Sequence, residues 1–382
     1  MVTTQKKMNR AANRIADNYT RLEQQLFYLL IDATKDTRSL LLDTDHPLEW
    51  RFAMLQKMGG LTKEIVRLVS RTIGVSEKQI YELINDQGLS VAKQMSNQLA
   101  TTLGIKPQPI SADINAIIKS YGRQTFRDID NNVNQTLLTT NYGENSVIRV
   151  YQDIINRTTL DISTGRKTPQ RALTDNILQW QDKGMQSALI DKGGHNWSLE
   201  GYTRTVLTST ANRVFNDVRV QSMKDYDTVL CVMTSHPASR EACAPIQGKV
   251  VNIVPATDPR FDSEFDTIYN HGYGKPAGTL GINCGHMLYP YVKGVSHNFQ
   301  KEYDPEEAQA NMDIQQKQRY YERSIRHKKL QLETAKRTGD EVAQRRLKKG
   351  IRGYQKKLRT IVKDNRFLAR QYDRERVVAK GG

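Results

Sequence analysis

The segment between residues 234 and 291 decides how this 382-residue chain is organised. It opens with TSHPASREACAPIQGKV at 234–250 and closes with YGKPAGTLGINCGH at 273–286. Two of the three cysteines, three of the seven histidines and six glycines fall within it. The sequence before and after it has helical spacing. A turn-rich segment with soft metal-ligand residues between helical arms indicates a small domain that needs its own source of stability.

Two short apolar runs border the first half of this segment. They are Val229–Met233 and Lys249–Ile253, and turn-forming residues surround both. Their length and their β-branched content predict a strand pair or a three-stranded sheet. We therefore expect a small α+β domain over residues 226–300. Cys231 lies in the middle of the first run and is predicted to be a buried structural thiol.

The chain before this domain, residues 1–225, has the spacing of amphipathic helices. The pattern predicts helices over 8–34, 48–58, 61–73 and 76–103, with Gly59-Gly60 separating the second from the third. Further helices are expected up to residue 225. The apolar stripe of the first helix consists of Ile15, Tyr19, Leu22, Leu26, Leu29 and Ala33.

The chain after the α+β domain predicts an antiparallel helical hairpin over residues 304–376. Asp304 is placed as an N-cap and Pro305 as the first helical residue. Thr338-Gly339-Asp340 is the expected turn between the helices. The fold class is therefore mainly α, with a long-helix N-terminal domain, a small α+β domain that carries the Cys/His motif, and a C-terminal basic hairpin. The apolar stripe of the hairpin consists of Ile314, Tyr321, Ile325, Leu332, Ala335, Leu347, Ile351, Tyr354, Leu358 and Ile361.

Nearly all of the excess positive charge lies in the hairpin. Residues 314–382 contain 22 of the 57 Lys and Arg but only 7 of the 41 Asp and Glu, a net charge of +15 out of +16. This asymmetry indicates a polyanionic partner, and double-stranded DNA bound without sequence specificity is the first interpretation. An acidic surface on a partner protein and a merely solvated helical face are the alternatives. The cations expected to face outward and grip phosphates are Lys328, Lys329, Arg345, Arg346, Lys348, Lys349, Lys356 and Lys357.

Several classes of function have no support in the sequence. No apolar run reaches about 18 residues, so a membrane span is not expected, and the N-terminus lacks the apolar core of a signal peptide. The phosphate-binding loop of nucleotide hydrolases, the glycine motif of dinucleotide binding and the HExxH zinc motif do not occur. We therefore expect no small-molecule substrate. Three cysteines do not make a disulfide framework, which favours a reducing compartment during synthesis.

The Cys/His segment contains one candidate metal site. His236, Cys243, Cys284 and His286 supply two imidazoles and two thiolates, a set that suits tetrahedral zinc. The two cysteines are separated by 40 residues, which is not the spacing of a standard zinc finger. His271 is a possible substitute ligand. In the alternative interpretation the cysteines are small buried residues and the histidines are hydrogen-bonded or lie at the surface.

A second chemical interpretation uses the same residues for catalysis. Cys243 could be a nucleophile with His286 as its base, and Asn283 or Glu241 could orient the imidazole. No nucleophile elbow or other local signature of a cysteine enzyme accompanies them.

The motifs of this segment resemble the phage minor capsid protein 2 family, a branch of the head-morphogenesis proteins typified by the Mu F protein. The resemblance covers roughly residues 200–376. The residues that carry it are the two stretches quoted above, together with Asp304-Pro305-Glu306-Glu307-Ala308, Gln316-Lys317-Gln318-Arg319-Tyr320 and Arg370-Gln371-Tyr372-Asp373-Arg374-Glu375.

The resemblance implies a ligand set that differs at one position. The wider group commonly has a Cys-x2-Cys pair followed later by a Cys-x-Cys pair. Here Cys243 matches the second cysteine of the first pair, and Arg240 stands where the first would be. Cys284 and His286 match the later pair, and His236 could supply the missing ligand.

The resemblance also implies a function. It predicts a non-enzymatic minor capsid protein of a tailed bacteriophage, made in the host cytoplasm and located inside the capsid near the portal. Its expected partners are the portal protein, the major capsid protein or both, and packaged DNA. The alternative is a metal-dependent or cysteine hydrolase used during infection. A site closed by four ligands would indicate a structural role, and three ligands plus water in a cleft would indicate catalysis.

Overall fold

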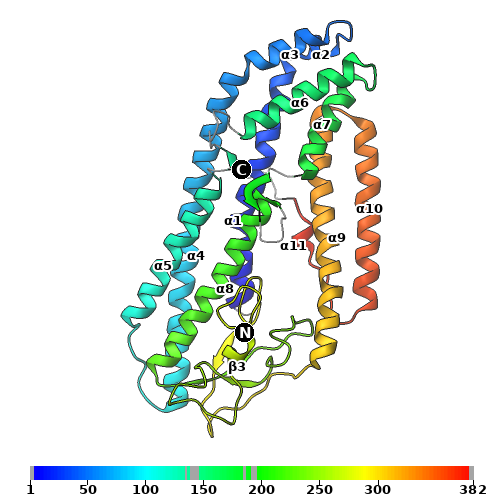
Figure 1. The fold of residues 1–382 in the computed structure, drawn as a ribbon. Coiled ribbons are helices and arrows are strands. Elements are labelled where there is room, and N and C mark those ends of the chain that lie inside the picture. The colour runs from blue at the N-terminus through cyan, green and yellow to red at the C-terminus, as the bar shows by residue number, and fades with distance from the viewer. Residues whose placement is uncertain (1–3, 134–135, 138–145, 184–185, 191–195, 378–382) are drawn as a thin grey trace. The chain divides into compact units, whose positions relative to one another are not determined.

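The computed structural model describes residues 4–133, 136–137, 146–183, 186–190 and 196–377 (Figure 1). Most of these residues are helical, and the described strands form one two-stranded and one three-stranded sheet. The predicted mainly α fold is therefore confirmed. The helices are α1 (Thr4–Lys35), α2 (Arg38–Leu42), α3 (Pro47–Gln56), α4 (Met58–Leu103), α5 (Ala112–Val133), α6 (Ser146–Ser163), α7 (Pro169–Lys183), α8 (Leu199–Asp225), α9 (Pro305–Thr338), α10 (Glu341–Asp364) and α11 (Tyr372–Glu375).

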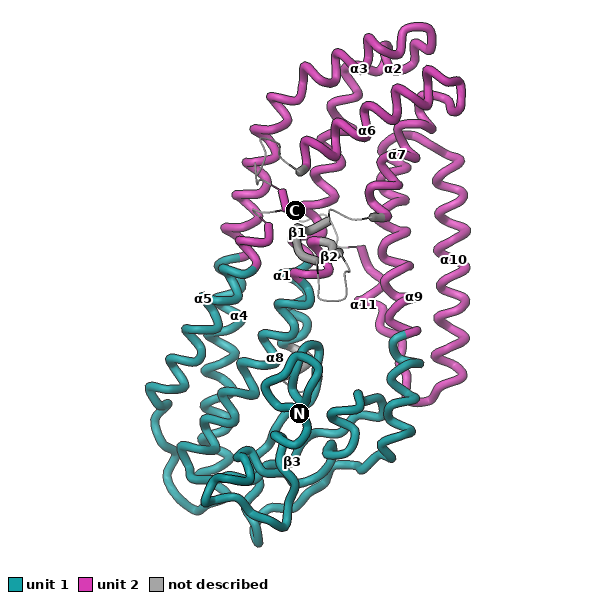
Figure 2. Tube along the Cα trace, in the orientation of Figure 1, with its two compact units in different colours: residues 1–16, 77–128, 204–316 teal, residues 17–76, 129–203, 317–382 magenta. Residues whose placement is uncertain are grey.

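The chain divides into two compact units, which Figure 2 distinguishes by colour. Unit 1 consists of residues 1–16, 77–128 and 204–316, and unit 2 consists of residues 17–76, 129–203 and 317–382. Each unit thus draws on three separate parts of the sequence. The predicted division into domains 1–225, 226–300 and 304–376 concerns which segments fold on their own, and it stays a prediction.

Unit 1 contains the small sheet that supports the Cys/His segment. Its strands are β3 (Leu230–Met233), β4 (Val250–Asn252) and β5 (Leu288–Pro290), in the order β4-β3-β5 with both pairs antiparallel. The two strands predicted from the apolar runs are confirmed as β3 and β4. The central strand β3 is buried along its whole length, and Cys231 within it is fully buried as predicted.

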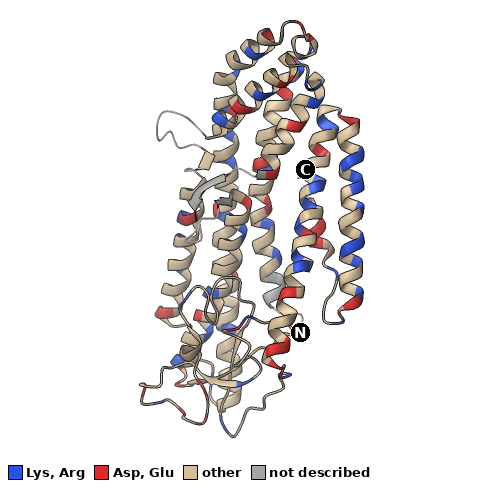
Figure 3. Cartoon of the chain, turned by 45° about the vertical axis from the view of Figure 1, so that its right-hand side comes forward, with Lys and Arg blue, Asp and Glu red and all other residues tan. Residues whose placement is uncertain are grey.

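Unit 2 contains α10 and α9 from Lys317 onward, which form an antiparallel hairpin and lie side by side in both views (Figures 1 and 3). Gly339 makes the turn with φ +78°, a left-handed conformation that glycine adopts without strain. The side chain of Asp340 then caps α10 by accepting a hydrogen bond of 2.9 Å from the backbone nitrogen of Ala343. Both features match the turn expected at residues 338–340.

Every residue of the predicted apolar stripe of the hairpin except Ile314 packs in at least one of two clusters of unit 2. Ile325, Ile351 and Leu358 form one buried cluster between α9 and α10. A second cluster joins the hairpin to α7, where Leu178 packs with Ala335, Ala343 and Leu347. Polar contacts reinforce this second cluster, because Gln170 donates a 2.7 Å hydrogen bond to the carbonyl oxygen of Thr338 and Gln181 donates one of the same length to Thr334 Oγ1.

A two-stranded antiparallel sheet that the sequence patterns did not predict lies between α7 and α8 along the chain. It is formed by β1 (Gln186–Ile190) and β2 (Asn196–Ser198). No helix in the part of the chain that the structure describes combines the length and apolar character needed to cross a membrane.

The break predicted at Gly59-Gly60 falls earlier, at Lys57 between α3 and α4, and the predicted boundary between helices 61–73 and 76–103 is wrong because α4 is continuous there. Helix α4 begins at Met58 and continues to Leu103 through both glycines, which are exposed. A glycine costs a helix about 1 kcal/mol relative to alanine. The apolar residues that follow at intervals of four, Leu61, Ile65 and Val69, are all buried, and this packing outweighs that cost.

Candidate metal centre and basic helical face

The first ligand-bearing segment follows β3 and folds into consecutive turns. At its base the backbone nitrogen of Gly248 donates to the carbonyl oxygen of Met233 at 2.9 Å. Within it, the nitrogen of Cys243 donates to the carbonyl of Arg240 and the nitrogen of Gln247 donates to the carbonyl of Cys243, both at 2.9 Å. These hydrogen bonds fix the backbone on either side of Cys243, whose side chain is fully buried.

The second ligand-bearing segment requires glycine where its backbone folds on itself. A Cβ atom at Gly278 would lie 1.9 Å from the carbonyl oxygen of Gly272, which no side chain could tolerate. Just before the ligands, Asn283 adopts φ +58°, and its backbone nitrogen donates a 3.0 Å hydrogen bond to Ser209 Oγ on α8. The turn that presents Cys284 is therefore held by its own backbone and by α8.

Helix α8 also fixes the residues that follow Cys284. The side-chain amide of Asn216 is buried, and its nitrogen donates to the carbonyl oxygen of His286 at 3.0 Å. Its oxygen accepts from the backbone nitrogen of Leu288 at 3.3 Å. One amide thus anchors both the ligand-bearing turn and the first residue of β5.

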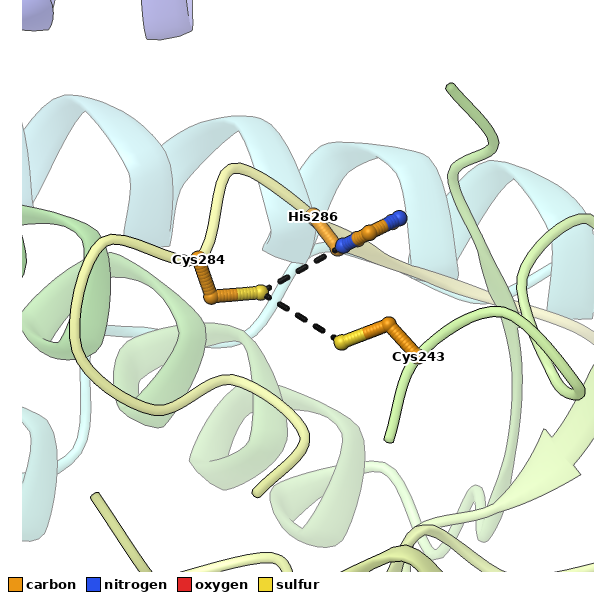
Figure 4. A group of neighbouring side chains, drawn as sticks. All are labelled: Cys243, Cys284 and His286. Carbon is orange, nitrogen blue, oxygen red and sulfur yellow. Dashed lines mark hydrogen bonds between the residues drawn. The ribbon is translucent and has the colours of Figure 1, made fainter. Parts of the chain in front are cut away.

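Three of the four predicted ligands come together in a buried cluster (Figure 4). The donor atoms of Cys243, Cys284 and His286 all lie within 4.8 Å of one another. The two sulfur atoms are 3.9 Å apart, and Cys284 Sγ lies 3.3 Å from His286 Nδ1. In a tetrahedral zinc site with bonds of about 2.3 Å to sulfur and about 2.0 Å to nitrogen, these separations are about 3.8 and about 3.5 Å. Two of the three separations therefore match those of a zinc tetrahedron, and the third, between Cys243 and His286, is no more than 4.8 Å.

The tautomer of His286 is set by Gln247. The side-chain oxygen of Gln247 accepts a 2.9 Å hydrogen bond from the backbone nitrogen of His236, which identifies this atom as the amide oxygen. The same oxygen lies 3.0 Å from His286 Nε2. Since an amide oxygen only accepts, Nε2 carries the proton and Nδ1 presents its lone pair to Cys284. A partner that fixes the second ring nitrogen is typical of metal-binding histidines.

His236, the fourth predicted ligand, lies beside the cluster. Its ring centroid is 4.7 Å from that of His286, and its Nε2 is 3.4 Å from the carbonyl oxygen of Gly285. Burial, and secondarily His286, lowers the pKa of His236, so its imidazole is neutral near pH 7, as a metal ligand must be. The substitute ligand His271 lies elsewhere, with Nε2 2.7 Å from the carboxylate of Asp266.

The two thiols of the cluster differ in their proton affinity. The hydrogen bond from Cys243 lowers the pKa of Cys284 well below that of a free thiol despite burial. The same sulfur–sulfur contact, together with burial, raises the pKa of Cys243. The thiolate that a metal requires is therefore favoured at Cys284.

The geometry bears on the cysteine-nucleophile interpretation. The sulfur atom in contact with His286 Nδ1 belongs to Cys284, whereas that interpretation used Cys243. Both thiols and the imidazole are buried, and Glu241 is exposed. A cysteine nucleophile must be accessible to its substrate, and both sulfur atoms belong to buried side chains.

The predicted phosphate-gripping residues lie along the α9–α10 hairpin, where Figure 3 shows Lys and Arg following α10. Six of them are exposed on α10: Arg345, Arg346, Lys348, Lys349, Lys356 and Lys357. Lys328 and Lys329 on α9 are half-buried, and Lys329 Nζ donates to the carbonyl oxygen of Glu375 at 2.8 Å. Arg346 lies 3.3 Å from Asp175. The most accessible charge is therefore on α10, where residues 342–363 include nine Lys or Arg and neither Asp nor Glu.

The sequence analysis did not identify two residues that orient the Cys/His cluster through hydrogen bonds. Gln247 fixes the tautomer of His286, and Asn216 anchors the turn through hydrogen bonds to backbone atoms. Gln247 does belong to the motif quoted above, but no spacing rule relates an amide to an imidazole 39 residues away. Asn216 lies within an ordinary helical stripe and gives no signal in the sequence.

The described residues define a mainly helical protein with two small sheets and a buried Cys/His cluster that could hold a metal ion. Comparison with known proteins adds the family. The family model for phage minor capsid protein 2 matches residues 3–363. The chain belongs to this family and is a phage structural protein of the minor capsid class, as the motif resemblance implied.

Two relatives are both named structural protein. The one from Lactococcus phage LL-H is 51% identical over 362 residues, which cover 94% of this chain and 98% of the relative. The one from Lactococcus phage mv4 is 55% identical over 120 residues, 31% of this chain and 98% of that relative. No solved structure matches the chain significantly.

Proposed function

We propose that this protein is a non-enzymatic component of the phage head, located inside the capsid near the portal. Its partners are the portal protein, the major capsid protein or both, and it assembles with them in the host cytoplasm. Membership of the minor capsid family supports this proposal. The test is to probe purified virions for the chain by quantitative mass spectrometry, before and after DNA release. Absence of the chain from full virions would contradict the proposal.

The buried Cys/His cluster is proposed to bind one zinc ion that stabilises the small domain. Cys243, Cys284 and His286 would hold the metal, and His236 is the candidate for the fourth position. The observation that carries this proposal is the convergence of three donor atoms, with the lone pair of His286 Nδ1 turned toward them. Zinc would link two turn-rich segments that are 40 residues apart in the chain. Structural sites of this kind contribute folding free energy directly, about 10 kcal/mol or more in small domains.

The basic face of α10 is proposed to contact packaged double-stranded DNA without sequence specificity. The run of nine cations without an acid over 342–363 supports this role. Lysine and arginine side chains on a helix surface bind phosphates, and they identify bases only when the helix enters a groove in a defined register. The predicted binding is therefore independent of sequence and falls steeply with salt.

Substitution tests the DNA contact better than truncation, because Leu178 of α7 loses its packing partners if the hairpin is removed. The variant replaces Lys348, Lys349, Lys356 and Lys357 with Gln. A control with the same loss of charge replaces four exposed cations of α4, namely Lys63, Arg67, Arg71 and Lys93. Duplex affinity is measured at several salt concentrations.

The hairpin variant should lower the slope of log affinity against log salt by up to about 3.6, since each of the four phosphate contacts contributes about 0.9. The control should retain the slope of the original chain. Equal losses in both variants would contradict a localised site. If the original chain fails to bind duplex at low salt, an acidic protein surface becomes the better partner for α10.

A further inference from the structure

An aromatic cluster lies at the surface of the basic hairpin, in unit 2. Tyr320 and Tyr321 on α9 and Tyr354 on α10 have ring centroids 5.7 to 6.1 Å apart. The hydroxyl oxygens of Tyr320 and Tyr354 are 3.4 Å apart. These three tyrosines lie on the hairpin that carries the basic face of α10. A role that depends on positive charge alone does not explain why aromatic rings converge there.

Packing explains two of these tyrosines but not the third. Tyr321 and Tyr354 pack against the buried cluster that contains Ile325 and Ile351. Tyr320 does not belong to that cluster, and 50% of its surface is exposed. Its ring therefore contributes little to the core of the hairpin and remains accessible to a ligand.

Cations border the tyrosines. Lys357 Nζ lies 5.8 Å from the centroid of the Tyr354 ring. The stem of Lys328 crosses from α9 toward α10 at Gly350, where a Cβ atom would lie 3.0 Å from Lys328 Cδ. The hydrogen bond from Tyr354 lowers the pKa of Tyr320, and the nearby Lys357 and Lys328 lower it further. The positive charges are thus close enough to the ring to act on it.

Gly353 leaves open space on the face of α10 that carries Tyr354, and the stem of Lys328 lies against Gly350. Gly350, Gly353, Tyr354 and Lys357 are spaced at i, i+3, i+4 and i+7, which places them on one face of the helix. Space next to Gly353 is open, with no atom within 4 Å of the position a Cβ would take. Glycine at these positions lowers the stability of the helix. It leaves small residues beside the ring of Tyr354, and Lys357 lies at the edge of that ring.

We propose that Tyr320 and Tyr354 form a stacking platform for unpaired bases, and that Lys328 and Lys357 hold the adjacent phosphates. The ligand is a single-stranded polynucleotide. Every base has a π-face that can stack on an aromatic ring, whereas in a duplex those faces are hidden between neighbouring base pairs. The proposal rests on the proposed nucleic-acid contact of the hairpin and adds to it a preference for single strands.

The experiment measures binding of the full chain to labelled oligo-dT, oligo-U and a duplex of equal length at matched salt, by fluorescence anisotropy. Tyr320→Ala removes the accessible ring, and Tyr320→Trp keeps an aromatic surface. Tyr372→Ala is the control, because Tyr372 is 61% exposed, lies on α11 and stacks with Arg370 rather than with the three tyrosines of the platform. Circular dichroism melting checks that each variant is folded.

Tyr320→Ala should weaken single-strand binding roughly 5- to 100-fold, the range expected for one stacked base, and leave duplex binding unchanged. Tyr320→Trp should retain single-strand binding, and Tyr372→Ala should match the original chain. Equal binding of oligo-dT and oligo-U indicates stacking without recognition of the sugar, and a preference for one identifies the natural strand.

Two results would overturn the proposal in different ways. If the chain binds duplex but Tyr320→Ala has no effect on single strands, or weakens both ligands equally, the platform is refuted and the proposed duplex contact stands. If the chain binds neither single strands nor duplex at low salt, the platform and the nucleic-acid role of the hairpin both fail.

Discussion

At the scale of single residues, the sequence identified three residues of the buried Cys/His cluster but not the atoms that orient them. Cys243, Cys284 and His286 were chosen by residue type, and the structure brings them within 4.8 Å. His236 lies next to His286 but outside this group. The role of Gln247 depends on how the turn after β3 brings residue 247 against residue 286, and such a contact across folded segments has no local pattern.

The contribution of Gln247 can be measured separately from the ligands. Gln247→Leu removes the oxygen that fixes the proton on His286 Nε2, and we expect zinc affinity to fall by about 10- to 100-fold. Competition with a chromogenic chelator gives the affinity. The control is Gln300→Leu, which removes another side-chain oxygen that accepts from a backbone nitrogen, that of Ser235 at 3.1 Å. Unchanged affinity in Gln247→Leu would mean that this contact does not orient a metal ligand.

At the scale of elements, the helical pattern predicted where helices occur better than which residues they bury. The predicted stripe of α1 is correct for Ile15, Tyr19, Leu22 and Leu26, all of which are buried. Further along, the buried residues are Leu30 and Thr34 rather than the predicted Leu29 and Ala33. A repeat of seven residues drifts by about 20° per repeat on a helix of 3.6 residues per turn, so a stripe read over seven-residue steps moves off the buried face.

Strands and helix boundaries also depend on packing that a local sequence pattern does not show. The apolar runs predicted β3 and β4 because both are buried and β-branched. Strand β5 has the sequence Leu-Tyr-Pro, which contains no β-branched residue and ends in Pro290, so its composition does not indicate a strand. Gly59-Gly60 has the composition of a break, yet the buried residues that follow keep α4 continuous. Tertiary packing determines both strand β5 and the continuity of α4, and a short stretch of sequence does not reveal such packing.

The glycine requirement of the 271–286 segment gives a prediction for this element. Gly278→Ala would place a Cβ atom 1.9 Å from the Gly272 carbonyl oxygen, so the turn must open, and we expect a loss of at least about 2 kcal/mol in the free energy of unfolding. Gly285→Ala, in the same segment and between two ligands, has no atom within 4 Å of its new Cβ and should be close to neutral. Chemical denaturation of both variants compares them, and equal stabilities would show that the fold of this turn is incorrect.

At the scale of the whole molecule, the sequence predicted a mainly helical phage structural protein. Patterns are read along the sequence, so they suggested three consecutive domains, and which segments fold on their own stays a prediction. The two compact units each combine three separate segments. Such groupings depend on contacts between distant parts of the chain, for example Leu178 with Ala335 in unit 2, and no periodicity encodes them.

Metal removal should affect one part of the chain far more than the rest. Treatment with a strong zinc chelator is expected to raise hydrogen–deuterium exchange across residues 234–291, because zinc would hold these turns together. Exchange across α10 should change little, since its apolar residues pack against α7 and α9. Mass spectrometry of peptides from the intact protein resolves the two regions. A uniform rise over the whole chain would contradict a local structural role for the metal.

The central claim is that the Cys/His cluster is a structural metal centre, and native mass spectrometry of the intact chain tests it most directly. We predict a mass increase equal to one zinc ion per chain and its loss in Cys284→Ser, together with a lower melting temperature. Cys231→Ala removes a buried thiol of β3 outside the cluster and should keep the metal. A metal-free original chain, with Cys284→Ser melting at the same temperature, would contradict the claim.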